Sequence, residues 1–285
     1  MLREIPLATT LGIEHIEMTP ERSVFRMPIP EWSRHADGRL PAGAVAAIVD
    51  MTQGFAASTA RPEGGSLVTT RIQIDFPRGL PRRAESITAV GTLRHADSRR
   101  GLSHGDVTDE HDNVIASGTL DALYLPAGRR PQGARTDGDR QPSAVEGGAT
   151  ARPAHPLLYG SPVHHALKTR VDDAGPGAVT ISVPAERRFA NTSGALHGGF
   201  GALLGDLAQD LALATVDHHP DLDVTELRVL YLRGLPADGC LVTTRAAVVH
   251  HGRSLVVTRA EILTADGRIA VQAEASHTRV GTAGS

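Results

Sequence analysis

The sequence predicts an α+β protein built from two tandem copies of one domain, paired as a pseudo-dimer. In each copy we expect an antiparallel sheet of about five strands wrapped around a central apolar helix. Three observations lead to this prediction: an internal repeat, one long apolar segment in each copy, and four strand-like runs after each of those segments.

The repeat is visible as short landmarks that recur at a nearly constant separation. The apolar segment that ends at Asp50 recurs with its end at Asp206, 156 residues later. The tetrapeptide Arg-Gly-Leu-Pro at 78–81 recurs at 233–236, 155 residues later, and the turn at Asp112 recurs at Asp266, 154 residues later. An offset that drifts so slowly indicates the duplication of a whole domain.

The boundary between the copies is predicted from composition. Residues 126–153 are rich in Pro, Gly, Asp and Arg, and only Val145 supplies an aliphatic β-branched side chain. Such a stretch cannot bury a core and is typical of a flexible linker. We therefore expect domain 1 at residues 1–125 and domain 2 at residues 154–285.

The elements follow the same order in both copies. The apolar segments at about 43–59 and 199–216 predict one buried helix per copy, because they are apolar on most faces. A strand precedes each helix, at 23–27 and 178–183. Alternating runs then predict strands at about 66–77, 85–95, 101–110 and 113–124, and at about 223–232, 240–250, 254–264 and 268–279.

Composition excludes several functional classes. The 285 residues are 40% hydrophobic and 21% charged, the net charge is -3, and aromatic residues make up 3%. These values give no reason to expect a nucleic-acid or membrane partner. With one cysteine no intrachain disulfide can form, and no run is long enough to span a membrane, so we expect a cytoplasmic protein.

A loop-to-helix turn in the second copy carries the chemistry. Asn191 precedes the sequence His197-Gly198-Gly199, and Asp206 follows nine residues after the histidine. Backbone N–H groups at a helix N-terminus lack partners within the helix and favour negative charge, and glycine leaves them accessible. A carboxylate in an apolar helix is desolvated, so Asp50 and Asp206 need a structural partner or a catalytic role.

This spacing of Asn, His-Gly-Gly and Asp resembles the PaaI-type acyl-CoA thioesterases, whose fold is called hotdog. The resemblance covers both halves outside the linker and implies a tandem, or double, hotdog protein. It also implies that a hydroxyl on the strand after the helix assists the acid, a place that Thr69 occupies. The first copy departs from the motif, because His35, Pro41 and Ala42 replace the Asn, the His and the first Gly.

Geometry predicts how the halves share a site. Gly198 and Asp206 are eight residues apart on one helix, or about 12 Å, too far to serve one carbonyl group. The carboxylate must therefore come from the other copy. One composite site combines Asp50 and Thr69 with Asn191, His197, Gly198 and Gly199. The other combines Asp206 with His35, Pro41, Ala42 and Val224, and because it lacks most polar parts we expect only the first to be active.

Arginine residues could bind the phosphates of coenzyme A, since guanidinium groups bind phosphate oxygens bidentately. A solvated or ion-paired surface role is the simpler interpretation for any one of them. The candidates are Arg78, Arg82, Arg83, Arg99, Arg100, Arg233 and Arg253.

The leading prediction is an acyl-CoA or other acyl thioester hydrolase that needs no metal or cofactor and assembles as a homo-oligomer, a dimer of double hotdogs or larger. The histidines do not have metal-ligand spacing, and phosphate-loop, dinucleotide and Gly-x-Ser-x-Gly motifs are absent. Two alternatives stay open: a hotdog dehydratase or hydratase, and a non-catalytic acyl-CoA sensor. The sequence leaves acyl chain, carrier and the role of the carboxylate, base or nucleophile, undecided.

Overall fold

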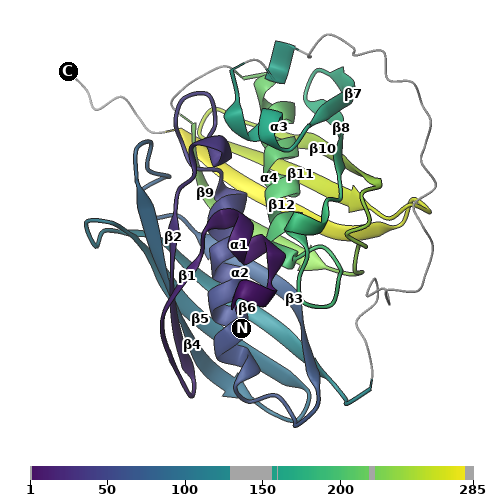
Figure 1. Ribbon diagram of the computed structural model, residues 1–285. Helices are drawn as coiled ribbons and strands as arrows, with labels where there is room; N and C mark the ends of the chain where they lie inside the picture. Colours follow the sequence, from purple (N-terminus) through teal and green to yellow (C-terminus); the bar gives the residue numbers. More distant parts are fainter. Residues whose placement is uncertain (1, 129–155, 159, 218–221, 280–285) are drawn as a thin grey trace.

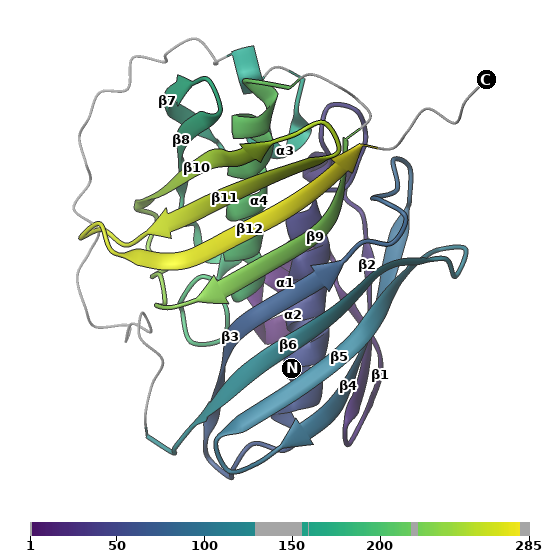
Figure 2. The same cartoon turned by 180° about the vertical axis from the view of Figure 1, so that it is seen from behind.

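The computed structural model describes residues 2–128, 156–158, 160–217 and 222–279. Within them, twelve strands form one sheet in the order β1-β2-β4-β5-β6-β3-β9-β12-β11-β10-β8-β7. Two long helices, α2 (Ala42–Ser58) and α4 (Gly198–Ala214), lie side by side against one face of this sheet, as the opposite views of Figures 1 and 2 show.

Each half contributes six strands and one short helix besides its long one. The first half has α1 (Pro6–Leu11), β1 (Glu14–Thr19), β2 (Arg22–Pro28), β3 (Ser66–Asp75), β4 (Ser86–Ala96), β5 (Arg100–Asp109) and β6 (Val114–Leu125). The second half has α3 (Pro162–Ala166), β7 (Arg170–Gly175), β8 (Ala178–Pro184), β9 (Leu222–Tyr231), β10 (Leu241–His251), β11 (Leu255–Leu263) and β12 (Ile269–Arg279).

The sixth strand of each half was not predicted. All six residues of β1 are exposed, and β7 has no buried residue either. Both strands lie at the edges of the sheet, where neither face packs on a core, so their sequences lack the alternation that marks a half-buried strand. Short 3₁₀ turns complete the described elements, at Leu2–Glu4, Glu31–Ser33, Pro156–Leu158 and Arg187–Phe189.

The two halves join at the centre of the sheet. Strand β3 pairs antiparallel with β9, with Arg71 opposite Leu230 and Asp75 opposite Glu226. The strand order is the same when read outward from this pair in either direction, as expected of duplicated halves related by a pseudo-two-fold axis.

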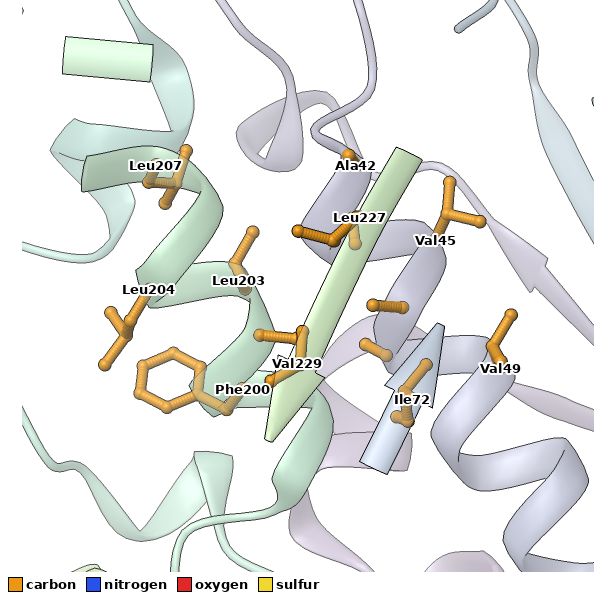
Figure 3. Close-up of a cluster of buried hydrophobic side chains, with 14 of the residues drawn as sticks. Ala42, Val45, Val49, Ile72, Phe200, Leu203, Leu204, Leu207, Leu227 and Val229 are labelled. Atoms are coloured by element: carbon orange, nitrogen blue, oxygen red, sulfur yellow. The ribbon is translucent and has the colours of Figure 1, made fainter. Parts of the chain in front are cut away.

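The helices approach each other at their N-terminal ends because glycine stands at both contacts. A Cβ on Gly43 would lie 2.4 Å from the Leu203 Cα, and one on Gly199 would lie 2.5 Å from the Ala47 Cα. Where the helices cross, their apolar side chains on the side of the sheet pack on buried residues of β3 and β9, including Ile72 and Leu227 (Figure 3). The crossing places each helix N-terminus against the middle of the other helix.

Residues 129–153 of the predicted linker lie outside the described residues. None of the helices that the structure describes has the length and apolar character required to cross a bilayer.

Candidate active site

The first composite site forms where Asp50 of α2 meets the N-terminus of α4. Asp50 is 4% exposed, and both of its carboxylate oxygens are held. Thr69 Oγ1, on β3, donates to Oδ1 at 2.7 Å, and the Gly199 N–H donates to Oδ2 at 2.9 Å. The structure thus brings together Asp50, Thr69 and Gly199 from three elements and both halves.

His197 caps α4 and completes the surroundings of this carboxylate. Its Nδ1 lies 3.1 Å from Asp50 Oδ2 and 3.1 Å from the Gly199 nitrogen. If Nδ1 carried no hydrogen, its lone pair would face a lone pair of Asp50 Oδ2 and the two would repel. We therefore assign the hydrogen to Nδ1, which then donates to Asp50. The Gly199 N–H points to the carboxylate at 2.9 Å, and its 3.1 Å approach to Nδ1 is the N-cap contact of α4. In this arrangement His197 orients the carboxylate and does not need to transfer a proton.

Gly198 supplies the unused donor of the turn. It is the first residue of α4 and is half-buried, and its N–H forms no hydrogen bond with any residue that the structure describes. The helix dipole favours negative charge here. A Cβ on Gly198 would lie 2.6 Å from Asp50 Oδ2, so a side chain at this position would displace the Asp50 carboxylate from where it lies.

Asn191 shapes the loop before His197 through its side-chain oxygen. Its Oδ1 accepts hydrogen bonds from the Ser193 N–H at 2.8 Å and the Ser193 Oγ at 2.7 Å. Its amide nitrogen donates to no group within the described parts of the chain. The side chain therefore fixes the turn through its oxygen and keeps its N–H donors available.

Tyr231, the last residue of β9, was missed by sequence reasoning. Its ring edge lies 3.3 Å from the point where a Cβ on Gly198 would stand, and its hydroxyl is buried without a hydrogen-bond partner. Burial, and then the charge of Asp50, raise the pKa of Tyr231 well above its ordinary value, so the phenol stays a neutral donor. At the offset of 155 residues that relates β9 to β3, its position corresponds to Phe76, so both copies have an aromatic residue at this place in the repeat.

The second composite site mirrors the backbone geometry of the first. Asp206 of α4 is 2% exposed, and it accepts the Gly43 N–H at the N-terminus of α2 at 2.8 Å. Ala42 takes the place of Gly198, Pro41 precedes it as the N-cap, and Val224 stands in the place of Thr69. These residues lie where the repeat predicts.

The motif positions of this second site are mostly apolar, but polar side chains that the motif does not name surround Asp206. His35 Nε2 lies 3.1 Å from Asp210 Oδ2, one helical turn beyond Asp206. These residues line a cavity of about 20 Å³ together with Arg39 and His277. Sequence comparison with the first motif missed the replacements because it followed only the residues that the motif names.

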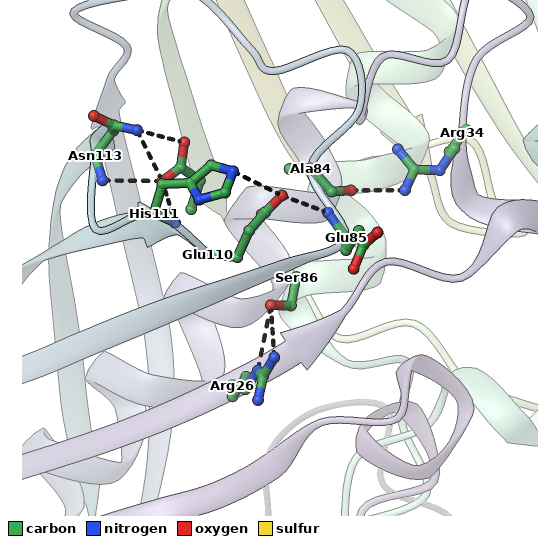
Figure 4. A network of polar contacts seen from close by, with 9 residues as sticks. Arg26, Arg34, Ala84, Glu85, Ser86, Glu110, His111 and Asn113 are labelled. Carbon is green, nitrogen blue, oxygen red and sulfur yellow. Dashed lines mark hydrogen bonds and ion pairs between the residues drawn. The ribbon is translucent and has the colours of Figure 1, made fainter.

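The loop that carries His35 and Arg39 is firmly held. The Arg34 side chain donates to Ala84 O at 2.7 Å, a contact that Figure 4 shows, and to Gly38 O at 3.2 Å. The backbone carbonyl of Arg34 accepts a hydrogen bond from the Val163 N–H of α3 at 3.1 Å, which ties the loop to the second half. The position of His35 is therefore fixed from both halves.

Charge is unevenly distributed over this cluster. Burial, reinforced by the charge of Asp210, raises the pKa of Asp206 to about 7. For Asp210 burial is the largest cause and acts in the same upward direction, but the hydrogen bond and charge of His35, with His277 and Arg39, together hold the carboxyl pKa below its ordinary value. For His35 burial is the largest cause and acts downward, but the hydrogen bond and charge of Asp210, with the charge of Asp206, together raise the imidazole pKa. An ion pair therefore sits beside a carboxyl that titrates near neutrality.

The ligand-type atoms of His35, Asp206 and Asp210 lie within 4.8 Å of one another, a spacing that could hold a metal ion. Each group already has a partner within the protein: His35 pairs with Asp210, and Asp206 accepts from Gly43. Arg39 adds a further positive charge to the lining. The cluster balances its own charges, and we assign no metal to it.

The predicted phosphate-binding arginines do not form one group. Arg78 is exposed and lines a surface groove with Leu80 and Pro81, whereas the exposed Arg82 lies 3.8 Å from Asp37. The remaining predicted arginines either bind groups of the protein itself or lie in other turns of the fold. Arg100 pairs with Asp121, Arg233 donates to Ile269 O, and the exposed Arg83, Arg99 and Arg253 lie in turns between strands.

Comparison with known proteins supports the fold. No family model matches the chain. A curated protein of Saccharolobus solfataricus, provisionally named an esterase, is 27% identical over 107 residues, which cover 38% of this chain and 75% of that protein. This identity is too low and the overlap too short to show a family.

Solved thioesterase structures are similar over nearly the whole length. The acyl-CoA thioesterase II TesB2 of Mycobacterium marinum has a TM-score of 0.59 at 15% identity, over 100% of this chain and 98% of its own. The tesB protein of Mycobacterium avium subspecies paratuberculosis gives 0.61 at 11%, over 96% and 98%. The 12:0-ACP thioesterase of Umbellularia californica gives 0.56 at 8%, over 91% and 94%. The α+β hotdog fold is thereby confirmed, and the narrower PaaI-type resemblance stays a prediction.

Proposed function

We propose that this protein hydrolyses acyl thioesters at the composite site around Asp50. The observation that carries the proposal is the juxtaposition of a buried carboxylate with an unused backbone N–H of Gly198 across two halves of the chain. Hydrolysis of a thioester needs a group that activates water and a donor for the oxyanion, and these two groups supply both.

In the proposed reaction, Asp50 accepts a proton from water while the water oxygen bonds to the thioester carbonyl carbon. The Gly198 N–H stabilises the negative charge that develops on the carbonyl oxygen. Collapse of the intermediate breaks the C–S bond, and the leaving thiolate takes the proton from Asp50. We favour a base over a nucleophile because Thr69 and Gly199 hold both carboxylate oxygens, which suits a fixed acceptor.

The nature of the substrate is part of the proposal. An acyl-CoA is the substrate that the sequence motif and the fold neighbours favour, and the neighbours also include a thioesterase for an acyl carrier protein. Arg78 in its groove is the arginine that we propose for contact with a carrier phosphate, because its side chain is exposed beside a hollow of about 250 Å³.

A thiol-release assay with a panel of acyl-CoAs tests the function. We expect the wild-type protein to turn over at least one of them and Asp50→Asn to lower kcat/KM by at least tenfold, because general base catalysis typically contributes about 10²–10⁴. Asp106→Asn, at an exposed position of β5, is the matched control and should keep full activity. Tight acyl-CoA binding by the wild type without turnover would contradict the proposal and favour a sensor.

A further inference from the structure

The buried and half-buried polar groups around Asp206 stand where the other half has small or apolar residues. At an offset of 156 residues, Asp210 corresponds to Gly54 and Arg39 to Ala195. His277 corresponds to Ala122, because His277 pairs with Val224 as Ala122 pairs with Thr69. Burying charged groups is unfavourable unless they are paired or used. A degenerate site would be expected to lose polar groups, whereas this one has gained three.

The features needed to stabilise an oxyanion are retained at this site. The Ala42 N–H is the counterpart of the Gly198 N–H, at the first residue of its helix, and it has no partner among the residues that the structure describes. The next N–H, of Gly43, holds Asp206 at 2.8 Å, as Gly199 holds Asp50 at 2.9 Å. A free donor and a buried carboxylate are therefore again neighbours.

Space for a water molecule lies next to this pair, and a larger groove lies nearby. The cavity of about 20 Å³ that Asp206 lines is large enough for one water molecule. Leu80 lines this cavity and also the groove of about 250 Å³ that Arg78, Pro81 and Asn113 border. Leu80 therefore borders both hollows, and Arg78 borders the groove.

We propose that the Asp206 site is a second hydrolytic centre for acyl thioesters, in which Asp206 activates a water in the cavity and the His35–Asp210 pair sets its charge. This inference rests on the proposed function and extends it to a site that has different polar residues. Water bonds to the carbonyl carbon as its proton passes to Asp206, the Ala42 N–H stabilises the oxyanion, and the C–S bond then breaks. The thiolate takes the proton back from Asp206. His35 and Asp210 are positioning residues in this step.

The charges facing Asp206 make this centre dependent on pH. Asp210 on the same helix raises the pKa of Asp206, and His35 and Arg39 on the preceding loop lower it, while burial sets the main upward shift. His277 on β12 and His164 on α3 also face the cluster, and burial lowers the pKa of both, so they stay neutral near pH 7. Asp37 pairs with Arg39 from outside the cavity.

The experiment isolates this centre by removing the first one. Thioester hydrolysis is measured as a function of pH on Asp50→Asn and on the double variant Asp50→Asn/Asp206→Asn, with thermal melting as the check on folding. We expect Asp50→Asn to keep an activity that increases with pH and is half-maximal near pH 7, the value at which Asp206 loses its proton. The double variant should lose at least tenfold more.

Two further variants test the positioning pair in the Asp50→Asn background. Asp210→Asn removes a like charge and should move the midpoint of the pH profile to lower pH, whereas His35→Gln removes a positive charge and should move it to higher pH. A purely structural role would not give shifts of opposite sign.

The outcomes separate this inference from the proposed function. If the wild type hydrolyses thioesters but Asp50→Asn is as inactive as the double variant, the second centre is disproved and the first stands. Shifts of the same sign for Asp210→Asn and His35→Gln would also overturn the inference. If the wild type has no thioesterase activity, the proposed function fails first.

Discussion

At the scale of single residues, the first site combines groups that the sequence identifies with one that it does not. Asp50 and Gly199 stand in a motif with fixed spacing, so their roles could be predicted before their contact was seen. Tyr231 belongs to no motif. Its relation to Gly198 depends on how the end of β9 lies against the N-terminus of α4, which no local sequence pattern encodes.

Tyr231→Phe should separate stability from activity. The substitution removes only a buried hydroxyl that has no partner, so we expect the melting temperature to stay the same or rise. If the phenol donates to the substrate, kcat should fall at least tenfold, because the loss of one such donor typically costs about 10²–10³ in kcat. Steady-state kinetics and thermal melting on the same preparation decide between these effects, and an unchanged kcat would show that the hydroxyl is idle.

Asp206→Asn should change how stability depends on pH. The folded-state pKa of Asp206, about 7, is above its ordinary value, so the folded protein binds this proton more tightly than the unfolded chain. The contribution of this proton to the stability of the folded protein is complete below about pH 4, and it is lost as the pH rises through about 7. Asparagine stays neutral and can still accept from Gly43. The variant should therefore gain roughly 1–3 kcal/mol relative to the wild type between pH 5 and pH 8.

Urea unfolding at the two pH values provides the measurement. Asp106→Asn removes an exposed carboxylate and should show no comparable gain. An Asp206→Asn variant that is less stable than the wild type at pH 8 would contradict the assignment of Asp206 as a buried, destabilising charge at that pH.

At the scale of elements, sequence periodicity predicted the helices and strands that bury an apolar face, and it missed the strands that are exposed on both faces. The helix expected at 43–59 is Ala42–Ser58, and the strand expected at 66–77 is Ser66–Asp75. Both bury an apolar face, so the core imposes a readable pattern on them. The edge strand β1 buries nothing, and the crossing of the two helices depends on single glycines that the apolar pattern does not distinguish from alanine.

Two glycines on α2 should respond in opposite ways to alanine. Gly43→Ala places a Cβ 2.4 Å from the Leu203 Cα, so the helices must separate, and we expect a loss of about 1–3 kcal/mol in unfolding free energy. Gly54 has nothing within 4 Å of that point, so Gly54→Ala should add about 0.5–1 kcal/mol through helix propensity alone. Chemical denaturation of both variants measures their unfolding free energies. Equal changes in the two variants would contradict this prediction.

At the scale of the whole molecule, the repeat predicted two copies but not how they share a core. One hydrophobic cluster runs through both halves, from Phe25 and Ile48 in the first to Phe200 and Leu227 in the second. The two halves also share a sheet through β3 and β9. Sequence offsets show that two segments are alike, and they contain no information on which surfaces of the two segments meet.

This shared core predicts that the halves unfold together. Trp32 is the single tryptophan, lies in the first half and packs against the common cluster, so its fluorescence reports on that half. Phe200→Ala removes a buried ring that stacks on Phe189 in the second half, and such a change usually lowers stability by about 3–5 kcal/mol. The denaturation midpoint seen by Trp32 should therefore fall with the one seen by circular dichroism.

Val249→Ala, at an exposed position of the second half, is the control and should move neither midpoint. If the Trp32 transition stayed in place while circular dichroism showed two steps, the halves would be separate folding units, and a site that needs Asp50 from one and Gly199 from the other would not be held by a common core.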